Sequence, residues 1–303
     1  MSWKAGHGHI QNTLLSIFNQ TYADFQLIIY DDCSPEDPSE LICSLIKDDP
    51  RASFIRGEKR LGSSSASQHI LSLAPLDTDY FAWISDHDLY DKYWLEKLIQ
   101  MLENNPEAAV SYPLVGGINS NGSPNNRKPT LYQNKEQSLK DRIDSFLSLH
   151  AGAGNIIWGL FRFSLLKKIG GWPRVIIPDR ILLARLTILG SIVQADDYLH
   201  TRREQEEREN SLSSASEGMI SMQIRGIFPS RPLYTYFDYR LVNSVYLFYK
   251  EPFSAAFSKK RNFLAAFFLW RKYNEYFALP VFKEIPKRVF SNRITRYIRK
   301  KLK

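Results

Sequence analysis

Compact apolar runs alternate with helical stretches over the first two thirds of the chain, and this alternation constrains the fold more than any other feature. Apolar runs of strand length occupy residues 25–30, 52–56, 80–84 and 108–112. Helical stretches lie before, between and beyond them, at residues 13–19, 39–47, 62–73, 94–102, 131–149 and 179–189. Strands that alternate with helices are typical of α/β domains with a parallel sheet. We therefore expect residues 1–203 to form one α/β domain, with a mostly parallel, Rossmann-like sheet flanked by helices.

The sequence changes character after Arg203. Residues 204–218 are charged and rich in Ser, which is typical of a linker or mobile loop. Residues 219–303 combine helical patterning with many aromatic and basic side chains. Within them, residues 259–303 hold 14 Lys and Arg against two acidic residues, a local charge of +12 in a chain whose total is +8. The sequence thus predicts a slightly acidic body and a basic, helical C-terminal region with a separate role.

Composition places the chain among ordinary globular proteins. It has 303 residues, 44% of them hydrophobic and 24% charged, enough for one large domain and an appendage. Cys33 and Cys43 provide no disulfide framework, which favours a reducing compartment. No secretory signal is visible, and the most apolar run, at residues 263–270, is far shorter than the roughly 20 residues a bilayer requires. These features predict a cytoplasmic location.

Two of the predicted strands end in carboxylates. Asp31 and Asp32 follow the first apolar run, and Asp86 and Asp88 follow the third. Ligands of open α/β sheets bind beyond the carboxyl ends of the strands. Side chains two residues apart in extended backbone point to the same side, and paired carboxylate oxygens suit Mg²⁺ or Mn²⁺. Asp86 and Asp88 therefore predict a metal site, although the same residues can instead cap the helix that follows.

Several motifs occur in a specific order. A strand ending in Asp-Asp-x-Ser-x-x-Asp is followed by a glycine-containing loop and a helix, and then by a strand ending in Asp-x-Asp. Together with later segments, the matching residues are 20–37, 80–88, 158–162, 166–172 and 178–190. As an ordered set, over roughly residues 10–205, they resemble family-2 glycosyltransferases of the GT-A fold. The resemblance implies an inverting, metal-dependent, hexosyltransferase-type enzyme that moves a sugar from a nucleotide-sugar donor to a hydroxyl acceptor.

The resemblance also implies roles for the acids at the strand ends. Asp31 and Asp32 would contact the nucleotide base and ribose. Asp86 would lie near the ribose and the metal, and Asp88 would bind the metal directly. A structural alternative stays open for the first pair, because aspartates after a strand also form turns.

Four residues outside these pairs complete the predicted site. Asp179 would be the general base that takes the proton of the acceptor hydroxyl, although it can also cap the helix it begins. Arg202 and Arg203 would clamp the diphosphate, or lie on the surface as most arginines do. His200 would join the metal shell or serve as a structural histidine. His87 is predicted to point away from the metal, and we assign it no role.

The start of the chain departs from the family pattern. The apolar strand that usually opens the family has no counterpart before the first predicted helix, and Arg60-Leu61-Gly62 replaces the usual Asn-x-Gly. A misassigned start, a shortened chain and a degenerate, non-catalytic nucleotide-binding relative each explain this departure. Metal-dependent nucleotidyl transfer is a further alternative, because that reaction also uses paired carboxylates.

The resemblance implies a UDP-sugar as the donor and a saccharide or lipid-linked acceptor, in envelope polysaccharide or glycolipid assembly. Residues 259–303 interleave aromatic and basic side chains, which suits binding to an anionic membrane surface. Such binding would place the enzyme on the inner face of the plasma membrane. Packing of a helical subdomain against the body is the alternative. We find no nucleic-acid-reading motif, and we therefore expect no nucleic-acid partner.

Overall fold

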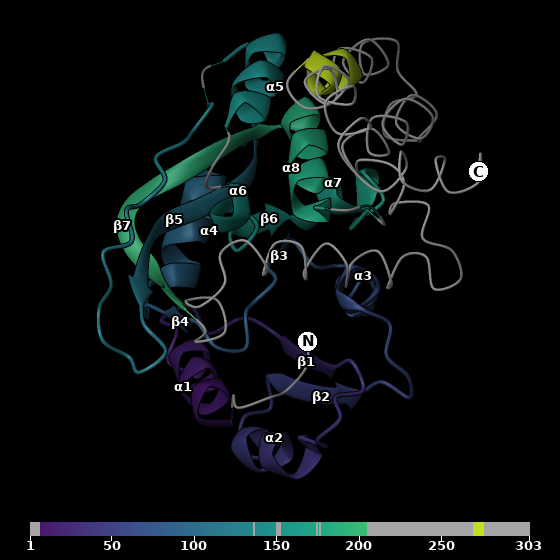
Figure 1. Ribbon diagram of the computed structural model, residues 1–303, viewed down its shortest axis with the longest axis vertical. Helices are drawn as coiled ribbons and strands as arrows, with labels where there is room; N and C mark the ends of the chain where they lie inside the picture. Colours follow the sequence, from purple (N-terminus) through teal and green to yellow (C-terminus); the bar gives the residue numbers. More distant parts are fainter. Residues whose placement is uncertain are drawn as a thin grey trace, which may run out of the picture.

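The computed structural model describes residues 7–135, 137–149, 153–173, 175, 177–204 and 269–275 (Figure 1). They form a mixed α/β fold in which helices flank a curled sheet, which confirms the predicted α/β class. The pairing differs from the mostly parallel sheet that the sequence predicts, because most of the strand pairings are antiparallel. Apart from Glu204, the predicted linker at 204–218 lies outside the described residues. The same holds for the predicted C-terminal region at 219–303 and its basic segment 259–303, except for residues 269–275.

The elements form two sheets. One sheet contains β1 and β2, and the other has the strand order β3-β6-β5-β7-β4. In chain order the elements are α1 (His7–Phe18), β1 (Leu27–Asp31), α2 (Ser39–Ile46), β2 (Ala52–Arg56), α3 (Ser63–Leu73), β3 (Tyr80–Phe81), β4 (Leu89–Tyr90), α4 (Trp94–Glu103), β5 (Ala108–Ile118), α5 (Leu139–Ser148), α6 (Ala153–Ile156), β6 (Leu160–Arg162), α7 (Phe163–Lys168), α8 (Pro178–Leu189) and β7 (Ser191–Arg203).

The smaller sheet lies in the lower part of Figure 1 with α1 and α2. β1 and β2 pair in parallel, with Asp31 opposite Arg56 at the end of the ladder. A parallel pair needs a crossover connection, which α2 provides. Ile10 and Leu14 of α1 and Ile42 of α2 form the buried core of this unit. The unit fixes the exit of β1, where the first pair of aspartates lies.

The larger sheet is organised around the long parallel pair of β5 and β7, which runs from Ala108 opposite Ser191 to Ile118 opposite Arg203. The remaining pairings, β3 with β6, β6 with β5 and β4 with β7, are antiparallel. Because β4 pairs with the end of β7, the chain just before β4 lies beside the last residues of β7. This contact brings the second pair of aspartates to the arginines that end the domain.

Helices cover both faces of the larger sheet. The neighbouring residues Ile192 and Val193 of β7 belong to different hydrophobic clusters, as expected when successive side chains point to opposite faces. Val193 packs with Leu98 and Leu102 of α4. Ile192 belongs to the larger cluster, which is formed mainly by α5, α7, α8 and the sheet.

Two predicted elements are shorter than expected. The helix predicted at 131–149 begins only at α5, where the Ser138 side chain accepts a hydrogen bond from the Asp141 backbone. Ahead of it, Asn134 and Ile192 exchange hydrogen bonds of 3.0 and 2.6 Å, which hold this segment against β7. β3 covers only two residues of the predicted strand at 80–84, because its one partner within the described residues is the short β6.

A helical segment at residues 269–275, yellow in Figure 1, packs against the body of the protein. Leu269 and Tyr273 are buried and belong to the same hydrophobic cluster as α5 and α8. Lys272 forms ion pairs with Asp144 of α5 at 2.9 Å and with Glu275 at 3.1 Å. Within the described residues, no helix combines the length and the apolar character needed to cross a membrane.

Candidate active site

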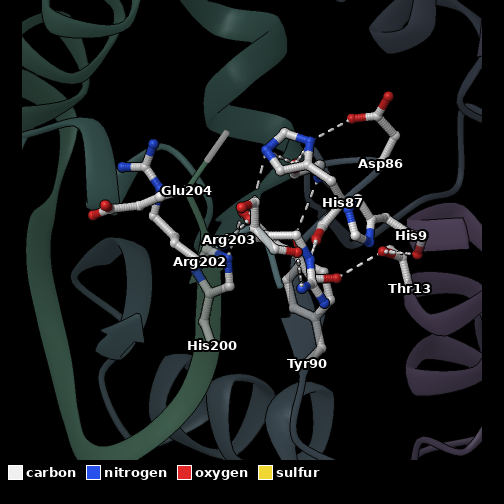
Figure 2. A network of polar contacts seen from close by, with 12 residues as sticks. His9, Thr13, Asp86, His87, Tyr90, His200, Arg202, Arg203 and Glu204 are labelled. Atoms are coloured by element: carbon white, nitrogen blue, oxygen red, sulfur yellow. Dashed lines mark hydrogen bonds and ion pairs between the residues drawn. The ribbon is translucent and has the colours of Figure 1, made fainter. Parts of the chain in front are cut away.

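The turn that connects β3 to β4 carries Asp86, His87 and Asp88 (Figure 2). Tyr90 of β4 holds it in place, because this residue pairs with His200 of β7. The two rings also stack in parallel, with centroids 4.9 Å apart. The Tyr90 hydroxyl accepts a hydrogen bond of 3.1 Å from the backbone N–H at residue 85, so the tyrosine fixes the turn to β7.

Asp88 is the centre of a buried hydrogen-bond network and is only 1% exposed. Its Oδ2 accepts a hydrogen bond from Nε2 of His200 at 3.0 Å, and its Oδ1 accepts one from the backbone N–H of Arg203 at 2.9 Å. Its backbone carbonyl accepts the Thr13 hydroxyl of α1 at 2.7 Å. Burial alone would raise the pKa of Asp88, but the hydrogen bond from His200 and the surrounding charges lower it. An ionised Asp88 thus joins α1, the turn and β7.

Asp86 and His87 occupy the more open side of the same turn, with side chains 36% and 19% exposed. Nδ1 of His87 lies 2.7 Å from Oδ1 of Asp86, and its Nε2 lies 3.7 Å from Oδ1 of Asp88. Burial alone would lower the pKa of His87, but the hydrogen bond to Asp86 and the charge of Asp88 raise it. The structure therefore places His87 between the two carboxylates, whereas the sequence predicted that it points away.

The predicted metal ligands Asp86, Asp88 and His200 do not fit a metal ion in this arrangement. Both carboxylate oxygens of Asp88 already accept N–H groups, and Nε2 of His200 donates to one of them. His200 is also fully buried. In the part of the chain that the structure describes, no group of three or more His, Cys, Asp or Glu residues is arranged to hold a metal ion. No chemical step is therefore assigned to a metal.

The two arginines at the end of β7 differ in their surroundings. Arg203 is 9% exposed, and its guanidinium donates to the backbone carbonyls of His87, Asn119 and Ser120. Arg202 is half-buried and donates to the side chain of Asn155 at 3.2 Å. Figure 2 shows Arg202 and Asp86 on opposite sides of the His87 side chain. Of the predicted arginine pair, Arg203 therefore braces the turn, and Arg202 instead contacts Asn155.

Asp31 and Asp32 are buried at the exit of β1, with exposed fractions of 4% and 5%. Asp31 accepts hydrogen bonds from the backbone and hydroxyl of Ser34 and forms an ion pair with Arg56. Asp32 accepts two backbone N–H groups just ahead of α3, at 2.7 and 2.8 Å, those of Leu61 and Gly62. Both carboxylates thus have partners within the protein. Their predicted contacts with base and ribose stay a prediction.

Asp179 lies in the first turn of α8, directly after Pro178. The residue before that proline, Ile177, has a φ of 55°, a left-handed conformation that β-branched residues rarely adopt. Burial raises the pKa of the Asp179 carboxyl above its ordinary value, although a hydrogen bond from the helix backbone opposes the shift. No hydrogen bond or ion pair joins Asp179 to residues 85–88, all of which the structure describes.

Three members of the network received no role from the sequence: His9, Thr13 and Tyr90. Burial lowers the pKa of His9, and the charges of Arg203 and His87 act in the same direction, so His9 lies close to the turn. Thr13 is 2% exposed and sits within the apolar stripe of α1. The position of Thr13, a polar residue on the apolar face of a helix, was the one sequence signal that could have indicated its role. Nothing in the local pattern distinguished Tyr90.

Solved structures share this fold. A crystal structure of S. aureus TarS 1–349 matches with a TM-score of 0.52 and 15% identity, over 89% of this chain and 87% of that one. A second structure of TarS 1–349, in complex with UDP, matches with a TM-score of 0.51 and 17% identity, over 73% of this chain and 62% of that one. At these identities the likeness establishes the fold alone. The shared fold, with carboxylates at two strand ends, is the GT-A-type α/β fold that the sequence predicts.

The sequence match identifies the family within that class. The family described as glycosyl transferase family 2 matches residues 8–170, more than half of the chain. The chain therefore belongs to glycosyl transferase family 2. It is also 28% identical over 130 residues to the uncharacterized glycosyltransferase MJ1057 of Methanocaldococcus jannaschii. That match covers 42% of this chain and 44% of the relative, so the chain spans less than half of the curated relative's length.

Proposed function

We propose that this chain transfers a sugar from a nucleoside-diphosphate sugar to a hydroxyl acceptor, with inversion at the anomeric carbon. Family membership over residues 8–170 is the observation that carries the proposal. The TarS structure with UDP, which shares the fold, supports a nucleotide donor and a UDP-sugar in particular. The arginine-rich end of β7 beside the turn at 85–88 supports diphosphate binding there, because guanidinium groups bind phosphate oxygens well.

Asp179 is the proposed general base. A carboxyl whose pKa is raised by burial accepts a proton more readily than an ordinary aspartate. It takes the proton of the acceptor hydroxyl while the acceptor oxygen forms a bond to the anomeric carbon. The bond between that carbon and the diphosphate oxygen breaks on the opposite face, so one displacement inverts the centre. The strained backbone at Ile177 supports a functional role, because such strain persists where the surrounding structure imposes it.

Arg202 is the proposed contact for the departing diphosphate, which leaves with the bonding electron pair and gains negative charge. A guanidinium placed where this charge develops lowers its cost. Asp86 is the proposed contact for the ribose, because it is the more exposed carboxylate of the turn. Members of the family commonly use a divalent metal. Asp86, Asp88 and His200 as arranged here do not form a site for Mn²⁺ or Mg²⁺, so the proposal gives a metal no role.

For the acceptor we propose a saccharide or lipid-linked hydroxyl in envelope polysaccharide or glycolipid assembly. Attachment to the inner face of the plasma membrane through residues 259–303 belongs to the same proposal. The basic and aromatic composition of that segment supports it. Apart from residues 269–275, the segment lies outside the described residues.

The test is turnover by the purified chain with a panel of nucleotide sugars, UDP-sugars first, with and without Mn²⁺. We expect release of the nucleoside diphosphate. Asp179→Asn should retain donor affinity while turnover falls by about 10²- to 10⁴-fold. Asp77→Asn, which changes an exposed aspartate outside the site, is the matched control and should behave as the wild type. Nucleotide binding without turnover would indicate a degenerate relative, and pyrophosphate release from a nucleoside triphosphate would indicate nucleotidyl transfer.

A further inference from the structure

The loop after β5 brings Arg127 next to the end of β7. Gly117 of β5 pairs in register with Arg202, and the backbone N–H of Asn125 donates back to the Gly117 carbonyl at 3.1 Å. A Cβ on Gly117 would lie 2.1 Å from Oδ1 of Asn125 and 2.8 Å from Cβ of Arg127. Glycine at this position therefore permits the close approach of the loop to the strand. Arg127 consequently lies beside Gly117, the residue that pairs with Arg202.

Arg127 and Arg202 converge on one buried acceptor. Oδ1 of Asn155 accepts Nη1 of Arg202 at 3.2 Å and Nη2 of Arg127 at 3.4 Å. Asn155 is 4% exposed, and its Nδ2 donates to the Thr130 hydroxyl at 3.5 Å, which turns the amide oxygen toward the arginines. An amide oxygen carries no net charge. Asn155 therefore orients two guanidinium groups without neutralising either.

The acid that approaches Arg127 holds it weakly. Nη1 of Arg127 lies 3.8 Å from Oε1 of Glu204, beyond hydrogen-bond distance, and the two side chains are 25% and 42% exposed. An exposed ion pair of this kind stabilises a protein by about 0–1 kcal/mol. Apart from this contact and the one with Asn155, the Arg127 guanidinium makes no hydrogen bond or ion pair within the described residues. Most of its N–H donors thus remain available to a ligand.

The charges of this pair reach the turn network. Burial is the main cause of the lowered pKa of His200, and the charges of Arg202 and Arg127 act in the same direction. Both arginines therefore lie close enough to influence the centre of the site. Arg203 differs, since it is nearly buried and its guanidinium donates to backbone carbonyls.

We propose that Arg127 and Arg202 form a two-guanidinium site that binds a phosphate group of the substrate, with Asn155 positioning both side chains. Planar guanidinium groups bind phosphate oxygens through paired hydrogen bonds, which an ammonium group does not reproduce. The phosphate belongs either to the diphosphate of the donor or to an anionic acceptor. The site deepens the proposed function and rests on it, because sugar transfer brings a phosphorylated substrate to this end of β7.

The experiment is calorimetric titration of the full chain with UDP, GDP, ADP, CDP and dTDP, and with the nucleoside of whichever diphosphate binds. Arg127→Gln removes the charge and retains a side chain able to contact Asn155. It should lower the affinity for the diphosphate by about 10-fold, the effect of losing a hydrogen bond to a charged group, and leave nucleoside affinity unchanged. Lys128→Gln changes the adjacent, exposed cation and is the matched control, with both affinities unchanged.

A second variant tests the same site without removing an arginine. Asn155→Asp places a carboxylate between the two guanidinium groups and should lower diphosphate affinity at least as much as Arg127→Gln. Thermal melts of all variants show whether they are folded. If the phosphate belongs to the acceptor, both variants keep nucleotide affinity and instead lose binding of glycerol 1-phosphate, titrated with and without saturating nucleotide.

Unchanged binding of both kinds of probe in folded Arg127→Gln and Asn155→Asp overturns the two-guanidinium site. Failure of the proposed function gives a different result, because the wild-type chain then neither transfers nor hydrolyses the sugar of any nucleotide sugar. In a degenerate relative that still binds a nucleoside diphosphate, the calorimetric comparison of the variants tests the two-guanidinium site as before. The remaining case is a wild-type chain that binds no nucleoside diphosphate. In that case the glycerol 1-phosphate titration alone decides whether Arg127 and Arg202 bind phosphate.

Discussion

The two pairs of aspartates at strand ends look alike in the sequence and differ in the structure. Asp31 and Asp32 after β1 are both buried, and every partner described for them lies within about 30 residues along the chain. Asp86 and Asp88 after β3 have different environments. Asp88 is buried and bonded to residues more than 100 positions later, whereas Asp86 remains 36% exposed.

This difference shows that an acid after a buried strand is only a candidate for catalysis or binding. Its role depends on which N–H groups the fold brings to it. At β1 a turn and the start of α3 supply those donors, so the carboxylates shape the loop. After β3, the end of β7 supplies N–H donors to Asp88, whereas Asp86 remains partly exposed. We therefore infer that Asp88 holds the site together and that Asp86 faces the substrate.

The largest expected effect is on stability, from Asp88→Ala. The change leaves two buried N–H groups, on His200 and Arg203, without an acceptor, which should lower the free energy of unfolding by about 3 kcal/mol. Urea denaturation followed by circular dichroism measures it. A variant as stable as the wild type would show that Asp88 is not structural and would erase the contrast with Asp86.

Asp86→Asn should show the opposite behaviour, with activity reduced and stability retained. Loss of a charged contact with the substrate should lower kcat/KM by roughly 10- to 100-fold, while the free energy of unfolding changes by less than about 0.5 kcal/mol. Steady-state kinetics with the accepted nucleotide sugar and a urea melt provide the two numbers. Equal activity of Asp86→Asn and wild type would leave the turn without a substrate-facing carboxylate.

Asp32→Ala sharpens the comparison from the other side. The carboxylate satisfies two backbone N–H groups ahead of α3, so its loss should lower the free energy of unfolding by about 1–2 kcal/mol, because those groups lose their acceptor. If the role of Asp32 is structural, the folded variant should bind the nucleoside of the donor almost as tightly as the wild type. The change in affinity, measured by calorimetry, should be less than about 3-fold, or roughly 0.6 kcal/mol. A much larger loss of nucleoside affinity would restore the predicted contact with the base or ribose.

The smallest effect is a difference in pH dependence between the carboxyls of Asp88 and Asp179. The folded pKa of Asp88 is lowered, so its stabilising contribution is present above the unfolded pKa and is lost as the pH falls through the folded pKa. The folded pKa of Asp179 is raised, so its ionisation costs stability as the pH rises. Asp179→Asn should therefore melt at a higher temperature than wild type at pH 7 and at the same temperature near pH 3. A constant difference at all pH values would exclude a raised pKa.

Local patterns were sufficient to predict much of the fold. The strand expected at 52–56 matches β2, and the helix expected at 94–102 ends one residue short of α4. Predictions failed where pairing over long distances decides the outcome. β5 was expected to end at Tyr112, but it continues through Gly116 and Gly117 because β7 runs beside it to Arg203.

The candidate site was predictable in its members and less so in their roles. The sequence selected Asp88, His200 and Arg203, and the structure brings these three together. Their use as hydrogen-bond partners depended on the register of β4 against β7, which no local pattern contains. The approach of Arg127 to Arg202 depends on a loop that folds back over Gly117, and no local sequence pattern connects those two residues.

A crystal structure of the chain with its preferred nucleoside diphosphate tests the division between the two aspartate pairs most directly. We predict that the diphosphate lies between Arg202 and the Asp86–His87 side of the turn, with Asp88 still bonded to His200 and to the Arg203 backbone. A diphosphate at the exit of β1 beside Asp31 and Asp32, or an Asp88 released from His200 to bind a metal, would contradict the account.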